Sequence, residues 1–259
     1  MENRLQPLQN QDRPSDEVVV RVSGLKKSFG SNHVLRGFDV DLHRGENVMV
    51  LGRSGSGKSV LIKCIIGLLV PDAGVIEVLG QDMMALQQED LDRMRARIGF
   101  LFQSNALYDS MTVRGNLEFP MRRHLRELQP EERNDRVIRA LADVGLEHTA
   151  NLMPSELSGG MRKRIGLART LIMRPEIVLY DEPTTGLDPI TSREIVELML
   201  DLQRGYGTSS ILISHDLNVA KLAANNVIVL HEGIAYAQGS YEQLMRSTDP
   251  VVRRFFDSL

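Results

Sequence analysis

The sequence contains Gly52-Arg53-Ser54-Gly55-Ser56-Gly57-Lys58-Ser59, which fits the phosphate-binding pattern G-x-x-x-x-G-K-[ST] at every fixed position. An apolar run at 48–51 precedes it as a predicted buried strand, and residues 60–66 follow it as a predicted helix. Glycines let such a loop turn its N–H groups toward phosphate oxygens, and the helix N-terminus adds its positive dipole end. Lys58 is then expected to reach the β- and γ-phosphates, and the Ser59 hydroxyl to hold Mg²⁺. The alternative, an ordinary Gly/Ser turn before a helix, is disfavoured because both flanks suit the motif.

Length and composition set the frame for this motif. The chain has 259 residues, with 31 Lys and Arg against 34 Asp and Glu, for a net charge of −3. This length suits one large α/β domain, or one domain with a lobe. The balance shows no basic surplus that would suggest a nucleic-acid partner, although a local patch is compatible with it. The single cysteine, Cys64, lies in an apolar helix, which favours a packing role and a reducing compartment.

No segment of the sequence is expected to cross a membrane. The longest apolar stretch, 60–70, contains Lys63 and stops at Pro71, short of the ~20 residues that a span requires. Residues 1–17 are polar, contain two prolines and lack an apolar core, which predicts a flexible tail rather than a signal peptide. We therefore expect a cytoplasmic protein whose membrane role would come through a partner.

Short β-branched stretches on both sides of the phosphate loop predict a second, smaller sheet. Residues 18–22 and 34–42 are predicted strands separated by a turn at 28–30, and residues 75–80 are a further predicted strand. These predict a small antiparallel sheet beside a parallel core. Phe29, in the predicted turn, is either a core residue or a platform on which adenine stacks.

A helical segment interrupts the strand pattern after residue 103. Helical periodicity covers 113–119 and 130–144, and Pro130-Glu131-Glu132 is a favourable helix start. This predicts a helical lobe, over about residues 104–160, inserted in the α/β core.

A second Gly/Ser turn, Leu157-Ser158-Gly159-Gly160-Met161, precedes an amphipathic helix over 162–171. It offers a second helix N-terminus suited to an anion. Since a chain that binds one nucleotide needs only one such site, we interpret this turn as serving the nucleotide held by another copy of the chain.

Polar residues close three further predicted strands. Residues 175–180 lead into Asp181-Glu182, residues 209–213 lead into Ser214-His215, and residues 98–102 lead into Gln103. Adjacent carboxylates at a buried strand end are costly unless they meet a cation or a positioned water, which disfavours a plain acidic loop. Asp181 suits the outer shell of Mg²⁺, through water, and Glu182 suits a general base or a polariser of the attacking water. His215 is expected to contact the γ-phosphate. Gln103 is either a plain strand-end residue or a sensor that reaches the metal and the attacking water.

The C-terminal part predicts a hairpin over 226–230 and 234–238, followed by a short helix capped by Ser240. The last segment has one apolar face, which comprises Val251, Val252, Phe255, Phe256 and Leu259. We expect this face to pack on the protein, with a docking helix as the alternative.

With these motifs in this order, residues 18–259 resemble the ATP-binding cassette (ABC) ATPases. The resemblance implies an α/β P-loop NTPase fold in a single domain: a RecA-like parallel sheet core, a small antiparallel β subdomain and an inserted helical subdomain. It also implies ATP and Mg²⁺ as cofactors. Two copies are expected to dimerise head to tail, so that Ser158, Gly159 and Gly160 of one copy close on the ATP of the other.

The resemblance also implies residue roles. Residues 52–59 match the Walker A loop, residues 177–181 match Walker B and residues 186–188 match the D-loop. Met161 departs from the usual Leu-Ser-Gly-Gly-Gln signature. The implied catalytic residues are Lys58, Gln103, Glu182 and His215, and the implied metal ligands are Ser59, Gln103 and Asp181. The implied nucleotide-binding residues are Phe29, Gly52, Arg53, Ser54, Gly55, Ser56, Gly57, Lys58, Ser59, Val60, Ser158, Gly159, Gly160 and Asp188.

Several stretches further resemble the ATPases of Mla-type systems, which move phospholipids across the bacterial envelope. These stretches are 102–113, 119–120, 153–161 with its methionine, and 249–255. The resemblance implies a multi-pass permease that docks near 103–113, a lipid-binding MCE-domain protein, in some systems a STAS-domain protein, and a place on the cytoplasmic face of the inner membrane. It implies no nucleic-acid partner.

Two alternatives accompany this interpretation. One is the same motor with another cargo, as in an amino-acid importer or a lipoprotein extractor. The other is a soluble ABC protein that acts on DNA or ribosomes, which the single cassette and the lack of a heptad run disfavour.

Overall fold

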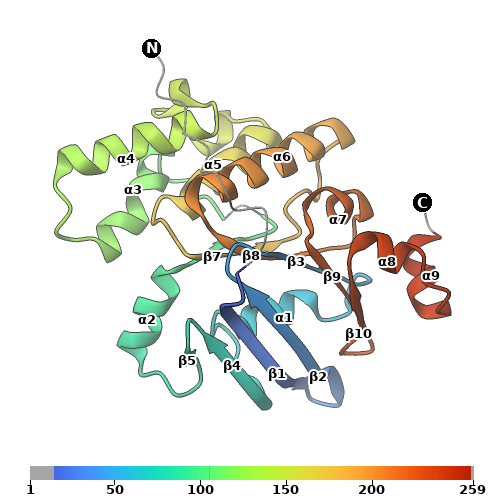
Figure 1. Ribbon diagram of the computed structural model, residues 1–259. Helices are drawn as coiled ribbons and strands as arrows, with labels where there is room; N and C mark the ends of the chain where they lie inside the picture. The colour runs from blue at the N-terminus through green and yellow to red at the C-terminus, as the bar shows by residue number, and fades with distance from the viewer. Residues whose placement is uncertain (1–14, 105, 258–259) are drawn as a thin grey trace.

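The computed structural model describes residues 15–104 and 106–257, arranged around two sheets (Figure 1). The larger sheet has the order β10-β9-β3-β8-β7-β6, and β3, β6, β7, β8 and β9 run parallel, while β10 pairs antiparallel with β9. Its strands are β3 (Asn47–Leu51), β6 (Ile98–Leu101), β7 (Ile177–Asp181), β8 (Ser209–Ser214), β9 (Asn226–His231) and β10 (Ile234–Gly239). The predicted α/β class with a parallel core is confirmed.

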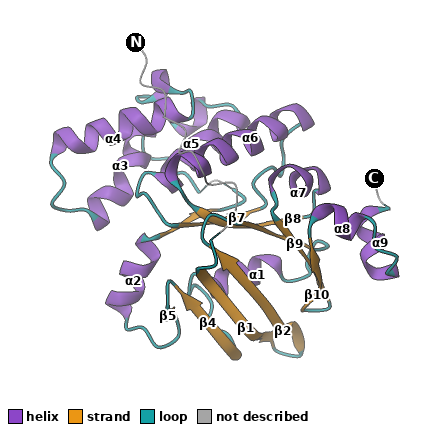
Figure 2. Cartoon of the chain, in the orientation of Figure 1, coloured by secondary structure: helices purple, strands orange, loops and turns teal. Residues whose placement is uncertain are grey.

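Helices and the smaller sheet bury both faces of this parallel sheet. Every residue of β3 is buried; Met49 and Leu51 join one apolar cluster, and Val48 and Val50 join the other. Such alternation is expected of a strand covered on both faces. Figure 2 shows α5, α6 and α7 over one face, with α1 and the antiparallel sheet on the other side.

The helices are α1 (Lys58–Ile65), α2 (Gln88–Ala96), α3 (Val113–His124), α4 (Pro130–Asp143), α5 (Gly159–Leu171), α6 (Pro189–Tyr206), α7 (Leu217–Ala223), α8 (Tyr241–Met245) and α9 (Pro250–Phe256), with 3₁₀ turns at Glu147–Thr149 and Pro154–Glu156. Within the described ranges, no helix combines the length and the apolar character needed to cross a membrane.

The smaller sheet has the order β2-β1-β4-β5 and is antiparallel throughout. Its strands are β1 (Val18–Phe29), β2 (Asn32–His43), β4 (Ala73–Val78) and β5 (Gln81–Asp82). The predicted end of β1 at residue 22 is wrong, because the strand runs on through register shifts to pair Phe29 with Asn32. Irregular pairing interrupts the alternation of buried and exposed side chains, and a prediction from sequence uses this alternation to set the length of a strand.

The helical lobe comprises α3, α4 and the two 3₁₀ turns between β6 and α5. The predicted end of α3 at residue 119 is wrong, because the helix continues through Pro120 to His124. Proline usually ends or kinks a helix. Here Leu117 and Met121, on either side of Pro120, are fully buried in the apolar cluster, and this packing favours continuation.

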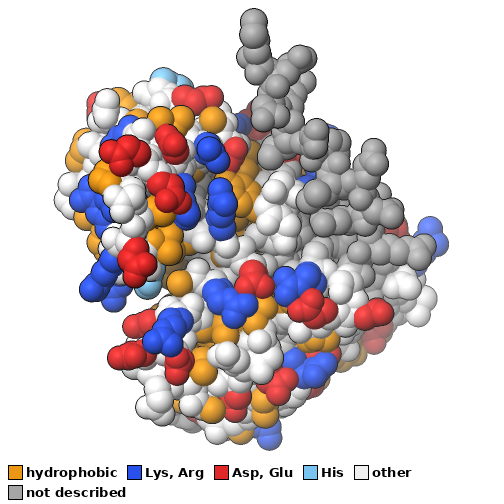
Figure 3. Space-filling model, turned by 60° about the vertical axis from the view of Figure 1, so that its left-hand side comes forward, with side chains coloured by type: hydrophobic (Ala, Val, Ile, Leu, Met, Phe, Trp, Pro, Cys, Tyr) orange, Lys and Arg blue, Asp and Glu red, His pale blue; other side chains and the backbone are white. Residues whose placement is uncertain are grey.

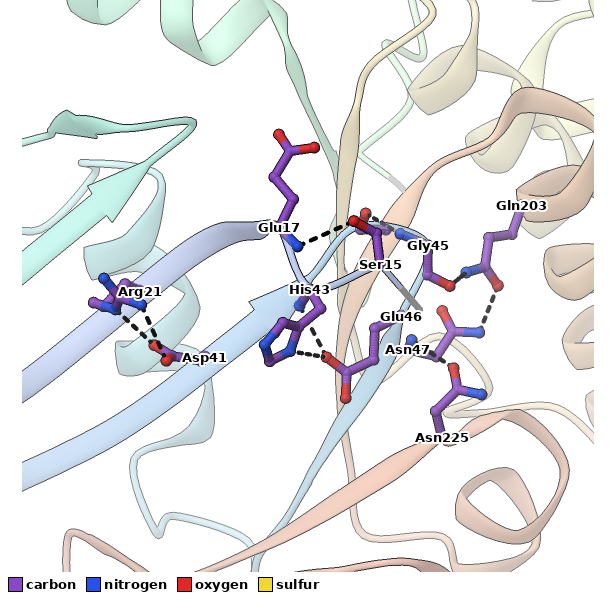
Figure 4. Close-up of polar contacts among 11 residues, drawn as sticks. Ser15, Glu17, Arg21, Asp41, His43, Gly45, Glu46, Asn47, Gln203 and Asn225 are labelled. Atoms are coloured by element: carbon purple, nitrogen blue, oxygen red, sulfur yellow. Dashed lines mark hydrogen bonds and ion pairs between the residues drawn. The ribbon is translucent and has the colours of Figure 1, made fainter. Parts of the chain in front are cut away.

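Side-chain hydrogen bonds close the N-terminal edge of the parallel sheet (Figure 4). The backbone N–H of Asn47, at the start of β3, donates to Asn225 Oδ1 (2.8 Å). Asn47 Nδ2 donates to Gln203 Oε1 on α6 (2.5 Å), and His43 Nδ1 lies 3.1 Å from Glu46 Oε2. This edge is therefore occupied by the protein's own polar groups.

The opposite edge of the sheet is left open by the same strand directions. Parallel strands place their C-terminal ends together, and ligands of open α/β sheets bind outside those ends. The ends of β3, β6, β7 and β8 lead into residues 52–57, Gln103, Glu182 and His215 respectively. The predicted functional residues that follow strands therefore meet at one edge.

Candidate active site

The loop between β3 and α1 has a backbone that requires glycine at two positions. Gly57 adopts φ 104°, in the left-handed region, and a Cβ there would lie 2.6 Å from Val34 Cγ1. A Cβ on Gly52 would lie 2.5 Å from Ser56 Oγ. Side chains at these positions would strain the backbone or fill the loop. The loop is thus a tight cradle with its N–H groups at the start of α1.

Two features of this cradle fit an anion. Helix α1 begins at Lys58 with no side-chain cap among the described residues, so its first N–H groups lack side-chain acceptors. The buried Ser56 Oγ likewise has no hydrogen-bond partner within the described ranges. Buried polar atoms are normally paired, so these donors suit a ligand that brings acceptor oxygens, such as a phosphate chain.

The predicted phosphate-binding lysine is buried and held by the loop itself. Lys58 Nζ donates to the carbonyl oxygens of Gly52 (2.8 Å) and Arg53 (3.2 Å). It also lies 3.3 Å from Glu182 Oε1, and both side chains are largely buried. A buried ion pair retains two charges away from water at a desolvation cost. Either side chain could therefore exchange its partner in this ion pair for another charged group that enters the site.

A serine–aspartate pair lies beside this lysine. Ser59 Oγ donates to Asp181 Oδ1 (3.0 Å). Burial raises the pKa of the Asp181 carboxyl, the hydrogen bond from Ser59 opposes that rise, and the charge of Glu182 adds to it. Groups of three or more His, Cys, Asp or Glu side chains able to hold a metal are absent from the described residues. A divalent cation here would need further oxygens, which nucleotide phosphates supply.

Glu182 occupies a constrained backbone position after β7. Its φ is 49°, an uncommon value for a residue with a side chain, and its N–H donates to the carbonyl oxygen of Ile213 on β8 (3.0 Å). His215 Nδ1 lies 3.0 Å from Glu182 Oε2. The Glu182 side chain is 12% exposed and that of His215 is 63% exposed. A carboxylate held between Lys58 and His215 can accept a proton from a water that reaches it.

A cavity of about 800 Å³ connects these groups. It is lined by loop residues Gly52, Arg53, Ser54, Gly55, Lys58 and Ser59, by Gln103, Glu182, Thr185, His215 and His231, and by Val251, Arg254 and Phe255 of α9. The structure thus brings Gln103, Glu182 and His215 to the phosphate loop. No local pattern in the sequence indicates that α9, about two hundred positions away, approaches the loop.

Other predicted nucleotide-binding residues lie outside this lining. Phe29 and Val60 are not among the described residues that line the cavity, and neither are Ser158, Gly159, Gly160 and Asp188. Phe29 is 48% exposed, and Lys27 Nζ lies 5.5 Å from the centre of its ring.

Ser158 caps its own helix, with Oγ accepting from Met161 N–H (3.2 Å). Asp188 caps α6 in the same manner, accepting from the N–H groups of Ile190 and Thr191.

One buried cation near the site was missed by the sequence reasoning. Lys163 on α5 is 2% exposed, and its Nζ donates to the carbonyl oxygen of Gln103 (2.8 Å). Its position could have been found, because Lys163, Leu167 and Leu171 follow each other at four-residue spacing and all three are buried. A lysine on the apolar face of a helix is uncommon unless its charge has a partner.

Comparisons with known proteins find similar ATP-binding proteins along nearly the whole chain. The sequence model of the family described as ABC transporter matches residues 35–185. A probable ribonucleotide transport ATP-binding protein, mkl, of Mycobacterium leprae is 39% identical over 240 residues, which cover 93% of this chain and 69% of its own. The methionine import ATP-binding protein MetN of Rhizobium etli is 39% identical over 223 residues, covering 86% and 61%. The chloroplastic protein TRIGALACTOSYLDIACYLGLYCEROL 3 of Arabidopsis thaliana is 36% identical over 256 residues, covering 92% and 73%.

Solved structures give the same family. The cbiO1 protein of Clostridium perfringens, part of the ABC transporter complex cbiONQ, has a TM-score of 0.82 at 30% identity, covering 92% of this chain and 94% of that one. The dimeric ATP-binding cassette MJ0796, bound to ADP and Pi in a post-hydrolysis state, has a TM-score of 0.78 at 31% identity, covering 86% and 98%. The chain therefore belongs to the ABC transporter family, as an ATP-binding domain that hydrolyses ATP in a reaction coupled to transport.

Proposed function

We propose that this chain is the motor of an Mla-type system, in which ATP hydrolysis drives phospholipid transport between the bacterial inner and outer membranes. The observation that carries the lipid cargo is the 36% identity, over 92% of the chain, to a plant protein whose name contains a glycerolipid, trigalactosyldiacylglycerol. The sequence features at 102–113, 153–161 and 249–255 support the same subgroup. Other relatives are named for ribonucleotide and methionine transport, so an importer of a small polar solute is the second candidate.

The chain would work as a dimer around two ATP molecules. Ser158, Gly159 and Gly160 begin a helix on the surface and do not line the cavity of their own chain, which supports a role at the nucleotide of a second copy. The nucleotide then touches both copies only in the closed state. This difference in affinity between the open and closed states is what a ligand needs to shift an equilibrium between them.

Within each site, Glu182 would accept a proton from the water that attacks the γ-phosphate. Binding of that phosphate to Lys58 would release the Lys58–Glu182 ion pair, and His215 would keep the carboxylate in place from its other oxygen. Ser59, Gln103 and Asp181 would hold Mg²⁺, which when bound neutralises phosphate charge. Phe29 would stack on adenine, and Asp188 would contact the second copy.

A permease would dock beside the helical lobe. A groove of about 190 Å³ lies between α2, α3 and α5, and among its lining residues are Phe100, Phe102, Pro120 and Arg169. Figure 3 shows the molecule from this side, with acidic and basic side chains intermixed over both the lobe and the antiparallel sheet. Docking of the permease would place the chain on the cytoplasmic face of the inner membrane. We further expect an MCE-domain lipid-binding partner, a STAS-domain partner in some systems, and no nucleic acid.

The test is to purify the tagged chain from its own membranes in mild detergent and to identify the copurifying proteins and lipids by mass spectrometry. Recovery with a multi-pass permease, an MCE-domain protein and phospholipid is the expected result. Recovery with a permease and a soluble amino-acid-binding protein would overturn the lipid cargo and leave the ATPase mechanism intact. An untagged strain serves as the control for detergent carry-over.

A further inference from the structure

The segment after β6 separates two cavities. We call residues 102–104 and 106–108 the Gln103 loop. Gln103 lines the nucleotide cavity, whereas Phe102 and Ala106 line the groove between α2, α3 and α5. A displacement of this loop would therefore alter both cavities together.

Two cations from α5 hold the Gln103 loop. Lys163 Nζ donates to the carbonyl oxygen of Gln103 (2.8 Å). Six residues further along the helix, Arg169 Nη1 donates to the carbonyl oxygen of Ala106 (2.5 Å), and the Arg169 guanidinium lies 4.7 Å from the centre of the Tyr108 ring. These contacts fix the loop at both of its ends to one rigid helix.

The first of these contacts is costly, which argues that it serves more than carbonyl pairing. Gln103 and Ala106 are exposed, so water could satisfy their carbonyl oxygens. Lys163 is instead 2% exposed, and removal of an ammonium group from water is unfavourable. Burial lowers the pKa of Lys163 to about 8, and the charge of Asp181 partly opposes this. A buried cation that donates its hydrogen bond to an exposed loop is explained if the activity of the site depends on where that loop lies.

We propose that Lys163 is a positioning residue, which places Gln103 relative to the nucleotide from the helix that Ser158 caps. The inference rests on the proposed function in one respect, the action of Gln103 at the nucleotide. Helix α5 begins at the turn expected to meet the nucleotide of the second copy. Any movement of α5 when the two copies close is then passed to Gln103 through Lys163, and to the groove through Arg169.

The kinetic test compares two substitutions on α5. Lys163→Met removes the contact with Gln103 and keeps the length of an unbranched side chain. Arg164→Met is the matched control, because Arg164 contacts Val144 and Glu194 and not the Gln103 loop. We expect Lys163→Met to lower kcat about tenfold while KM for Mg·ATP stays within about twofold, since an interaction used after substrate binding is lost. Lys163→Arg, which keeps a cationic donor, should restore kcat to within about threefold of the parent.

A spectroscopic test reports the loop directly. The chain contains no tryptophan, so Phe102→Trp introduces a single reporter in the Gln103 loop. In this background, Mg·ATP should shift the emission of the parent and of the Arg164→Met chain. The Lys163→Met chain should show the emission of a solvent-exposed indole before nucleotide is added and little change afterwards.

The outcomes separate this inference from the proposed function. Unchanged kcat and an unchanged reporter response in Lys163→Met would overturn the role of Lys163. A loss of kcat that is matched by Arg164→Met, with an equal fall in melting temperature, would also overturn it, because it would show a merely structural contribution. If Lys163→Met does not fold, the reporter response of Lys163→Gln decides between the same two results. A parent chain that neither binds nor hydrolyses Mg·ATP would instead contradict the proposed function.

Discussion

Two turns rich in glycine and serine begin helices in this molecule, and they differ in how complete they are. The turn before α1 is tight: Gly57 has a left-handed backbone, and Lys58 is bonded to the loop carbonyls. The turn before α5 lies on the surface, Ser158 caps its own helix, and a Cβ on Gly159 would meet no atom closer than 3.9 Å.

The difference fits the proposal that one turn belongs to a site formed within the chain and the other to half of a site. Around the first turn, Asp181, Glu182 and His215 converge from neighbouring strands. The second turn lies at the surface, and its residues do not line the cavity in which those three side chains meet. A helix N-terminus alone is a weak anion site, so the second turn needs a surface supplied by another molecule to become specific.

The largest expected effect breaks the first site. Glu182→Gln removes the carboxylate between Lys58 and His215 and leaves the loop backbone unchanged. We expect kcat to fall about 10³-fold, within the range that general-base catalysis contributes, while ATP binding persists. ATPase assays and ATP-dependent dimerisation by size-exclusion chromatography measure the two effects. Normal turnover in this variant would remove Glu182 from the role of base.

The next effect breaks the second turn without disturbing the fold. Gly159→Asp places a carboxylate at the N-terminus of α5, which the helix dipole favours, so the melting temperature should change little. If the turn meets a phosphate of the second copy, repulsion should lower ATPase activity about 100-fold, while the single chain binds nucleotide normally. Full activity would show that the turn lies away from phosphate.

A matched pair of alanine substitutions sharpens the contrast in stability. Gly57→Ala would place a Cβ 2.6 Å from Val34 Cγ1 at a φ of 104°, so we expect the free energy of unfolding to fall by about 2–4 kcal/mol. Gly159→Ala adds a Cβ whose nearest neighbour is Leu187 Cδ2 at 3.9 Å, an ordinary van der Waals contact in a helical first turn, so the change should stay below about 1 kcal/mol. Urea denaturation of both variants compares the two positions, and equal destabilisation would contradict the difference between the turns.

Features encoded by local sequence were predicted well. The strand–loop–helix around residues 52–59 combines a continuous apolar run, a fixed glycine pattern and a helical period, and each is visible locally. The convergence of Gln103, Glu182 and His215 also follows from the sequence, because parallel strands end at one edge. The catalytic and binding roles assigned to these residues remain predictions.

Features set by tertiary packing were missed. The extension of β1 to Phe29 depends on pairing with β2, and the passage of α3 through Pro120 depends on burial of Met121. The approach of α9 to the cavity depends on its contacts with α8 and on the hydrogen bond from Tyr236 of β10 to Asp249, the residue that caps α9. The predicted tail over 1–17 falls largely outside the described residues, and its last residue, Glu17, pairs with Arg44. Competing long-range contacts override local preference in such places.

The smallest expected effect concerns the methionine that departs from the family signature. Met161 is partly buried against the apolar cluster of the lobe, and its N–H already bonds Ser158 Oγ. Met161→Gln keeps that backbone contact and the side-chain length, so ATPase activity should change by about threefold or less, with a small loss of stability from weaker apolar packing. Assays of kcat and melting temperature in parallel separate the two effects. A collapse of activity at unchanged melting temperature would mean that the methionine side chain itself contacts the second copy, and the half-site would then extend beyond Ser158 and its two glycines.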